Sequence, residues 1–219
     1  MSMWRFLVLA GVALLDGMLL LSFWRQFRRH GTLGLSFFRI GNRAQNIQDA
    51  ATVLGFVLLT WQAVIATRPS SKFSVLFRTQ ELLELSRATG AVLLFGGVAL
   101  CFVAQLHLGA SWRIGVKEDA KSSLVTSGFY RFSRNPIFLG LLTAFAGYAL
   151  LLPTVLSFAL LIGAYLGVRR QVAVEEKYLL FTHAEAYRAY AQRVGRFVPL
   201  IGRMHAVRTD AHGRQGVGG

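Results

Sequence analysis

The chain contains apolar runs long enough to cross a lipid bilayer, and they constrain its fold more than any other feature. A membrane-spanning helix needs about 17–25 mostly apolar residues. Residues 50–67 and 88–110 meet that requirement without any Asp, Glu, Lys or Arg, and residues 6–24 meet it with one interruption at Asp16. An ionisable residue inside a span is usually functional or paired within the bundle. We expect Asp16 to have a packing role.

A fourth uncharged run, residues 136–168, is too long for one span and just long enough for two that are tightly joined. Pro153 lies near its middle, and proline breaks a helix interior but is tolerated at a helix start. We therefore predict an all-α integral membrane protein with about five transmembrane helices, the last two forming a tight hairpin that turns at Leu152-Pro153.

The first run has the alternative of being a signal peptide. Arg25, Arg28 and Arg29 follow it directly, and no small-residue cleavage site stands out. It is interpreted as a membrane helix.

Composition supports a membrane protein and excludes an ordinary soluble domain. Hydrophobic residues make up 54% of the 219 residues and charged residues only 16%, and 24 Lys and Arg against 10 Asp and Glu give a net charge of +14. Five spans put residues 25–43, 113–134 and 169–219 on one side, and these segments hold 19 of the 24 basic residues. Basic loops mark the cytoplasmic side. We expect the C-terminus to be cytoplasmic and the compact chain to lie in a bacterial inner membrane. Nucleic acid is not an expected partner.

The residues that could hold a metal or a disulfide are sparse. Cys101 is the single cysteine, so no internal disulfide can form. The five histidines show no ligand-like spacing, and no metal is predicted. Gly96-Gly97, inside the third run, is interpreted as a site of close helix approach rather than a cofactor site.

Beyond residue 168 the pattern becomes amphipathic, which predicts a cytosolic C-terminal helix. A stripe on one face combines apolar and aromatic residues with one carboxylate and one imidazole: Val172, Glu176, Leu179, His183, Tyr187, Tyr190 and Val194. A buried carboxylate without a partner is costly, so Glu176 should be paired with an arginine or a ligand. Residues 200–219, rich in Gly, Arg and His without periodicity, are expected to form a disordered tail.

Two short segments could carry chemistry. Asn135-Pro136 is a good N-cap followed by a good first helical residue, and a helix start flanked by Arg131 and Arg134 suits a carboxylate or phosphate. The alternative is a simple cap with arginines that contact lipid headgroups. Further along, paired bases at residues 169–170 precede paired acids at 175–176 and could bind ribose hydroxyls, an amine or a sulfonium. The alternative there is a basic clamp followed by a solvated helical turn.

Residues 109–199 together resemble the isoprenylcysteine carboxyl methyltransferase family, part of a wider group of integral-membrane methyltransferases that includes phospholipid N-methyltransferases. Leu124-Val-Thr-Ser-Gly-Phe-Tyr130, continuing to Arg134-Asn-Pro136 and Gly140, is similar to the family's L-V-x-x-G-x-Y-x-x-x-R-H-P stretch. The second block matches the family's E-E-x-x-L and its later Tyr, Tyr, Val and Pro: Glu175-Glu176, Leu179, Tyr187, Tyr190, Val194 and Pro199.

The resemblance implies an S-adenosylmethionine site on the cytosolic side and a lipophilic or small hydrophobic acceptor that enters from the bilayer. It divides the chain into residues 1–110 with three spans, a catalytic region at 111–199 and the tail. Glu175 takes the place of the family's cofactor-contacting carboxylate. The other implied cofactor-binding residues are Ser122, Ser123, Leu124, Val125, Tyr130, Arg134, Asn135, Pro136, Ile137 and Phe138.

The sequence departs from the family pattern at several positions. Ser122 and Asn135 stand where histidine is common, and His183-Ala184 stands where Phe-Gly is usual. Gln171 occupies the place of an arginine suited to a substrate carboxylate, so carboxyl methylation is in doubt while methyl transfer is not. Arg170 is adjacent but points about 100° away on a regular helix.

Gln171 and Arg170 are nevertheless the expected substrate-binding residues. Glu176, His183 and Arg170 are the candidate catalytic residues, with Glu176 or His183 as the proton acceptor if the nucleophile is an amine or a thiol. Two other functions remain open: an NADPH-dependent membrane reductase of the sterol type on a related scaffold, and a non-catalytic membrane protein. The sequence does not indicate the oligomeric state.

Overall fold

The computed structural model describes residues 3–30, 43–68, 76, 79–108 and 124–204, and every regular element among them is helical. The main helices follow one another along the chain as α1 (Met3–His30), α2 (Arg43–Ala66), α3 (Gln80–Leu108), α4 (Pro136–Leu151) and α5 (Val155–Arg193). A short 3₁₀ helix, η2 (Gly128–Arg131), precedes α4. The predicted all-α architecture is confirmed.

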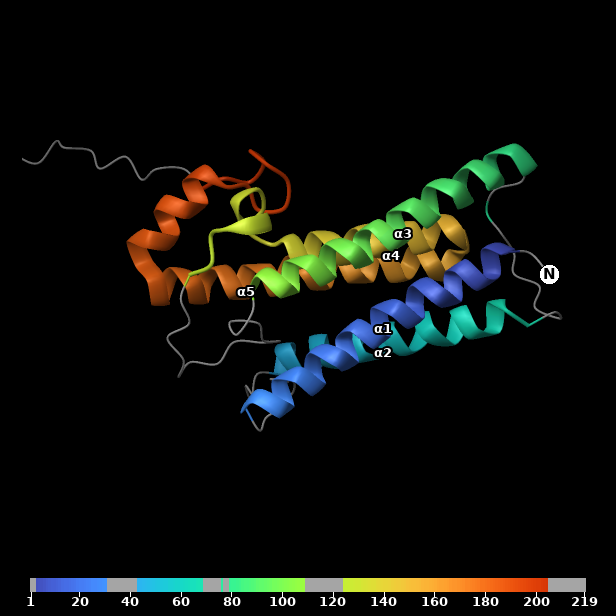
Figure 1. The fold of residues 1–219 in the computed structure, drawn as a ribbon, viewed down its shortest axis with the longest axis horizontal. Coiled ribbons are helices and arrows are strands. Elements are labelled where there is room, and N and C mark those ends of the chain that lie inside the picture. Colours follow the sequence, from blue (N-terminus) through green and yellow to red (C-terminus); the bar gives the residue numbers. More distant parts are fainter. Residues whose placement is uncertain (1–2, 31–42, 69–75, 77–78, 109–123, 205–219) are drawn as a thin grey trace, which may run out of the picture.

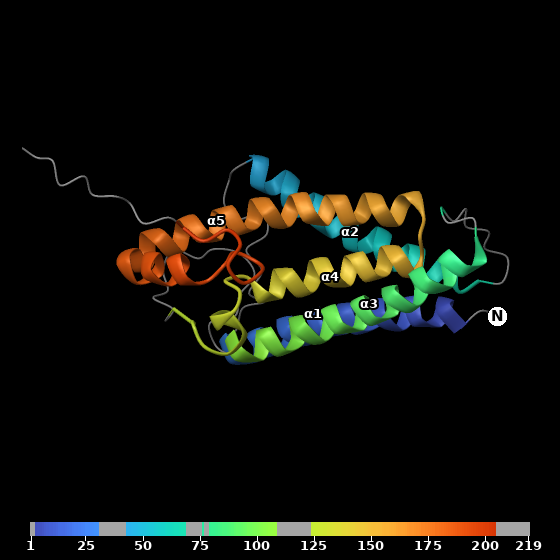
Figure 2. The ribbon, with the colours of Figure 1, turned by 90° about the horizontal axis from the view of Figure 1, so that it is seen from above.

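The helices form an elongated bundle that is long enough to cross a membrane (Figure 1). Four of them, α1, α2, α3 and α5, are sufficiently long and apolar to span a bilayer. The fifth, α4, has only 16 residues. It lies inside the bundle between α3 and α5 (Figure 2), with half of its residues buried, so its neighbours rather than lipid surround much of it. The protein is a multi-pass integral membrane protein.

The hairpin between α4 and α5 turns where the sequence predicts. α4 ends at Leu151, and the Thr154 hydroxyl caps α5 by accepting a hydrogen bond from the Ser157 amide. Pro153 lies between the two helices, where its missing amide proton costs nothing.

Glycines allow α3 and α4 to pack very closely, and this is the most extensive helix contact in the bundle. A Cβ atom on Gly97 would lie 2.4 Å from the Ala144 nitrogen, and one on Gly140 would lie 2.8 Å from the Cys101 nitrogen. By contrast, nothing lies within 4 Å of a Cβ placed on Gly96. The interpretation of Gly96-Gly97 as a point of close helix approach is therefore confirmed for Gly97.

Polar side chains inside the bundle are paired across helices. Ser86 and Cys101 on α3 donate hydrogen bonds to the carbonyl oxygens of Leu150 and Ile137 on α4. On α1, Asp16 accepts a hydrogen bond of 2.8 Å from the Thr60 hydroxyl of α2, which fits the packing role expected for it. Such pairs satisfy groups that lipid cannot hydrate.

The predicted C-terminal amphipathic helix directly continues the spanning part of α5, and within it the helix is kinked at Ala184, where two helical pieces meet. The uncharged part of α5, which ends at Val168, forms the spanning segment, and the remainder extends beyond it to Arg193. The periodicity of α5 selects Glu176 as the carboxylate on the buried face, whereas the family motif selects Glu175 as the cofactor contact. An irregular helix near Gln171 would allow both residues to face the site, but α5 is regular there. Its irregular residue is Ala184, with φ 34° and ψ −109°, where the helix bends sharply back (Figure 1).

Ala184 thus adopts a positive φ that favours glycine, the residue usual at this place in the resembling family.

The prediction of a disordered tail from residue 200 is wrong for residues 200–204, because they belong to a compact turn after α5. The Met204 amide donates to the Ala191 carbonyl and the Arg196 amide donates to the Ile201 carbonyl. Gly195 makes this turn possible, since a Cβ there would lie 2.0 Å from the Val198 oxygen. The remaining tail, residues 205–219, lies outside the described residues.

Replacing Gly97 with Ala should destabilise the protein, because the added methyl group overlaps the backbone of α4. We expect a loss of about 1–3 kcal/mol in the free energy of unfolding, measured by thermal or denaturant unfolding in detergent. Gly96→Ala is the matched control, and it should be neutral or slightly stabilising. Equal destabilisation by both variants would contradict the close α3–α4 contact.

Candidate functional site

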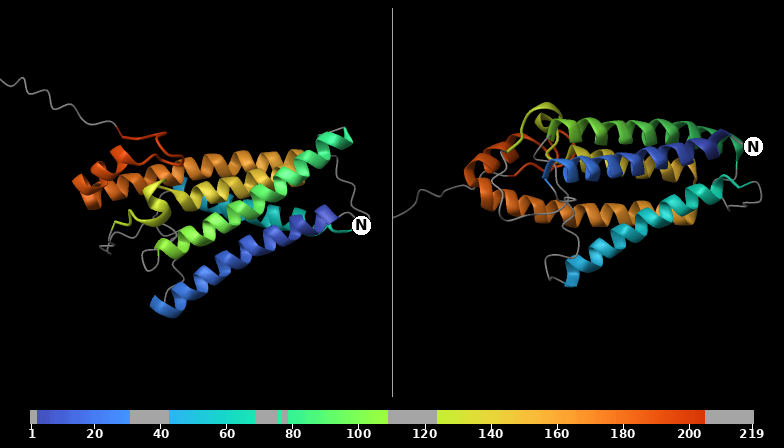
Figure 3. Two further views of the ribbon diagram at one scale, coloured as in Figure 1. Left: turned by 45° about the horizontal axis from the view of Figure 1, so that its top comes forward. Right: turned by 60° about the horizontal axis from the view of Figure 1, so that its bottom comes forward.

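The two motif blocks of the sequence meet at the end of the bundle opposite the hairpin turn. η2 and the start of α4 pack beside the part of α5 that extends beyond its span, and the turn after α5 folds back over them (Figure 3). The Tyr190 hydroxyl donates a 2.6 Å hydrogen bond to the Tyr130 carbonyl, which joins residues that are 60 positions apart. On the other side, η2 rests on the end of α3, where the Phe129 ring meets the His107 ring edge-on.

An apolar and aromatic cluster supports this junction. Tyr187 and Tyr190 are buried with Ala191 and Val194, and Leu124, Leu179 and Met204 pack against them. The buried face of α5 is the one that its periodicity predicts, since Val172 and Glu176 are also buried and His183 is half-buried.

Glu176 forms the centre of a buried ion-pair network. Its Oε1 atom accepts a 2.8 Å hydrogen bond from Arg134, and its Oε2 atom accepts one of 2.5 Å from Arg196. Arg134 also donates to the carbonyl oxygens of Ala191 and Gly202. The side chains of Arg134 and Glu176 are only 1% and 6% exposed. The expectation that Glu176 is paired with an arginine is confirmed.

Because each oxygen of the Glu176 carboxylate accepts a hydrogen bond from an arginine, Glu176 links segments of the chain and does not present a free base. One carboxylate joins the segment before α4, the extended part of α5 and the turn after α5. We call Glu176, Arg134 and Arg196 the arginine clamp. The clamp also occupies Arg134, which the sequence assigned to anion binding at the helix start.

Asn135 occupies the N-cap position of α4, but its side chain does not cap the helix. Its amide nitrogen Nδ2 donates instead to the Arg196 carbonyl, at 3.0 Å. The prediction that Asn135 caps α4 is correct for the position and wrong for the side-chain contact, because the turn after α5 offers a competing acceptor. The Pro136 ring is fully buried at the first turn.

Glu175 lies beside the clamp but in different surroundings. Its Oε1 atom accepts a 3.0 Å hydrogen bond from Gln171, one helical turn earlier. Burial raises the pKa of Glu175 to about 7, and the Gln171 amide opposes that rise. Burial, followed by the charge of Glu175, also raises the pKa of Tyr130.

A polar group from α2 also reaches this region, which the sequence analysis missed. Gln48 Nε2 donates to the Gly167 carbonyl at 3.2 Å and lies 3.5 Å from the Gln171 side-chain oxygen. The side-chain oxygens of Gln48 and Asn46 are buried and have no hydrogen-bond partner among the described residues. The polar start of α2, residues 45–49, was the available signal.

The remaining predicted site residues differ in their burial. Leu124 and Val125 are half-buried, as are Ile137 and Phe138 in the first turn of α4, whereas Arg170 is exposed. His183 Nε2 is buried and has no hydrogen-bond partner among the described residues. Ser122 and Ser123 lie outside the described residues.

Comparison with known proteins identifies the class. Residues 85–186, which contain most of α3, all of α4 and most of α5, match the sequence model of the phospholipid methyltransferase family. The chain is an integral-membrane methyltransferase. Within that class, residues 85–186 match the phospholipid methyltransferase family, and this match confirms the suspected family resemblance.

A solved structure is also similar to the chain, although the assignment rests on the family match. It is the eukaryotic intramembrane Ras methyltransferase, an isoprenylcysteine carboxyl methyltransferase, solved without a monobody. The two share 16% identity at a TM-score of 0.46, over 92% of this chain and 99% of that one. None of the curated proteins compared with the chain matches it significantly.

Removing the charge of Glu176 should cost far more stability than removing an exposed carboxylate. Glu176→Gln leaves Arg134 buried without a counter-charge, and we expect a loss of about 3–5 kcal/mol. The matched control is Glu185→Gln, because Glu185 also pairs with an arginine, Arg188, but its side chain is 83% exposed. That control should change stability by less than about 0.5 kcal/mol. Similar unfolding temperatures for the two variants would argue against the clamp.

Glu175→Gln should stabilise the protein instead, and the size of this gain should depend on pH. The pKa of Glu175 is raised from 4.5 to about 7, so its ionisation opposes folding as the pH rises through that interval. The ligand-free variant should therefore unfold at a higher temperature than the parent at pH 8, with a smaller difference at pH 5. Scanning calorimetry at both pH values measures this, and a gain that is independent of pH would refute the buried carboxylate.

Proposed function

We propose that the protein transfers the methyl group of S-adenosylmethionine to a lipophilic acceptor, at a site between η2, the start of α4 and the extended part of α5. The observation that carries the proposal is the direct contact between the two family blocks, where Tyr190 donates a hydrogen bond to the Tyr130 carbonyl and Arg134 pairs with Glu176. The first block and the start of the second lie inside the region that matches methyltransferases. Such contacts are what a site formed jointly by the two blocks requires.

The residues on both sides of this site fit the cofactor. Because the Asn135 side chain does not cap α4, the first-turn amides of Ile137 and Phe138 are candidate donors to the methionine carboxylate. Glu175 offers an acceptor for ribose hydroxyls or the amine. Tyr130, Leu124 and Val125 would complete the lining, and Ser122 and Ser123 remain proposed contacts on the basis of the resemblance.

S-adenosylmethionine supplies the electrophilic methyl group, so the protein mainly binds, orients and excludes water. The arginine clamp fixes the start of α4 against α5 and thus the distance between the two halves of the site. In this proposal Arg134 and Glu176 are positioning residues.

Proton transfer, where the acceptor requires it, is assigned to His183 rather than Glu176. The Glu176 carboxylate is held by two guanidinium groups, which leaves no free basic oxygen facing a substrate. His183 Nε2, by contrast, has an open hydrogen-bonding position among the described residues. A substrate amine or thiol would give its proton to that nitrogen.

We further propose that the acceptor group is not a carboxylate. The position of the family's arginine holds Gln171, whose amide is engaged with Glu175 and Gln48, and Arg170 is exposed. The nearby groups are mainly hydrogen-bond acceptors, which favours a donor such as an amine. No observation favours the reductase or the non-catalytic alternative. The distribution of basic residues supports a cytoplasmic location for this site.

Calorimetric titration of the detergent-purified protein with S-adenosylmethionine, S-adenosylhomocysteine and NADPH tests the cofactor. We expect the first two to bind, and Glu175→Gln to weaken them about tenfold or more, the effect of losing a hydrogen bond to a charged group. Tyr130→Phe should weaken binding less, and the exposed control Glu185→Gln should leave it unchanged. Binding of NADPH alone, or undiminished binding to Glu175→Gln, would overturn the proposal.

A further inference from the structure

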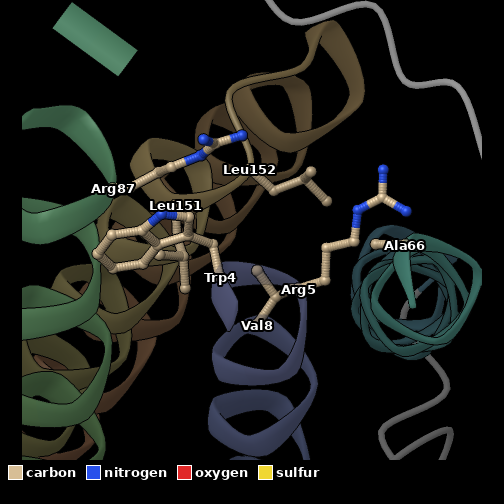
Figure 4. A pocket seen from close by; sticks show the side chains of 7 residues that line it. All are labelled: Trp4, Arg5, Val8, Ala66, Arg87, Leu151 and Leu152. Carbon is tan, nitrogen blue, oxygen red and sulfur yellow. The ribbon is translucent and has the colours of Figure 1, made fainter. Parts of the chain in front are cut away.

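A second cleft lies at the opposite end of the bundle, far from the proposed methyl-transfer site. It is lined by the start of α1, the end of α2, the first part of α3 and the end of α4 (Figure 4). Its volume is about 210 Å³, and it is partly open to the surroundings. Seven residues line it: Trp4, Arg5, Val8, Ala66, Arg87, Leu151 and Leu152.

Two guanidinium groups face this cleft from different helices. Arg87 comes from α3 and Arg5 from α1, and their side chains approach the cleft from different sides, with Leu152 between the two guanidinium groups in this view (Figure 4). Arg5 also donates to the Arg68 carbonyl, and Arg87 donates through Nη1 to Glu84. The Nε atom of Arg87, however, is buried and has no hydrogen-bond partner in the described part of the chain.

Glu84 compensates only part of this charge. Its two carboxylate oxygens accept hydrogen bonds from Arg87, Gln80 and Trp4. These donors come from α3 and, through Trp4, from α1, while Arg5 adds a second positive charge across the cleft. An anion is the ligand that would satisfy the remaining Arg87 donor close to both guanidinium groups.

The apolar part of the cleft identifies the source of that anion. Val8, Ala66, Leu151 and Leu152 supply this apolar lining, and they lie at or near the ends of α1, α2 and α4, of which α1 and α2 are long and apolar enough to span a bilayer. Trp and Arg side chains at such helix ends are typical of the membrane–water interface. A molecule that presents an anionic head at the interface and apolar chains below it fits both parts of the cleft.

We propose that this cleft binds the headgroup of an anionic phospholipid, with Arg5 and Arg87 contacting its phosphate and the apolar lining contacting the upper part of its acyl chains. The bound lipid would tie α1 to α3 at the hairpin end of the bundle. This site is independent of the methyl donor and of the acceptor.

Native mass spectrometry of the purified protein in detergent tests the proposal with equal amounts of phosphatidylglycerol and phosphatidylcholine. We expect about tenfold preferential retention of one phosphatidylglycerol, and its loss in the Arg5→Gln/Arg87→Gln double variant. Arg188→Gln is the matched control, because it removes an equal charge from an exposed ion pair. It should retain the lipid. Equal retention of the two lipids, or equal loss in the control, would overturn the proposal.

A second measurement keeps the test valid if the double variant does not fold. Trp4 lines the cleft, so its fluorescence, isolated by subtracting the Trp4→Phe signal, should be quenched more by brominated phosphatidylglycerol than by brominated phosphatidylcholine. Inorganic phosphate separates the two sources of the anion. Thermal stabilisation by phosphate equal to that by phosphatidylglycerol would show an ion site without lipid specificity and would overturn the lipid assignment.

Discussion

The buried carboxylate of Glu176 is the interaction on which the functional end of this protein depends. A carboxylate removed from water is tolerated only when it is paired, and here Arg134 and Arg196 approach it from opposite sides along the chain. Because these arginines belong to the segments before α4 and after α5, one charge fixes three parts of the chain. The position of Tyr130 relative to Glu175 follows from that constraint.

The close contact between α3 and α4 continues from this functional end through the membrane-spanning part of the bundle. Lipid provides little hydrophobic driving force for helix association, so close packing and internal hydrogen bonds must supply it. Gly97 and Gly140 bring the two backbones together, and Cys101 adds a side-chain hydrogen bond to the Ile137 carbonyl. The same helix pair therefore positions the proposed methyl-transfer site at one end and contributes Arg87 and Leu151 to the proposed lipid cleft at the other.

Glu175 and Glu176 show how adjacent identical residues acquire different chemistry. They are about 100° apart on a regular helix. Glu176 pairs with two guanidinium groups. Glu175 instead accepts a hydrogen bond from the Gln171 amide, and burial raises its pKa. Helical periodicity selected Glu176 because it detects burial, and Glu176 is indeed buried. The family motif selected Glu175 as the cofactor contact, which stays a prediction, and the helix is regular at both positions.

The sequence by itself determined the spans, the hairpin at Pro153, the buried face of α5 and the need of Glu176 for a cationic partner, because these depend on local hydrophobicity, proline geometry and the cost of a buried charge. Only the tertiary structure decided which arginines pair with Glu176, that Asn135 contacts Arg196 instead of capping α4, and that Gln48 of α2 reaches Gln171. These contacts join residues distant along the chain, and periodicity carries no information about which distant segments will meet. The continuation of α5 to Arg193 was likewise decided by packing, since its polar extension is held in place by the clamp and the tyrosine cluster.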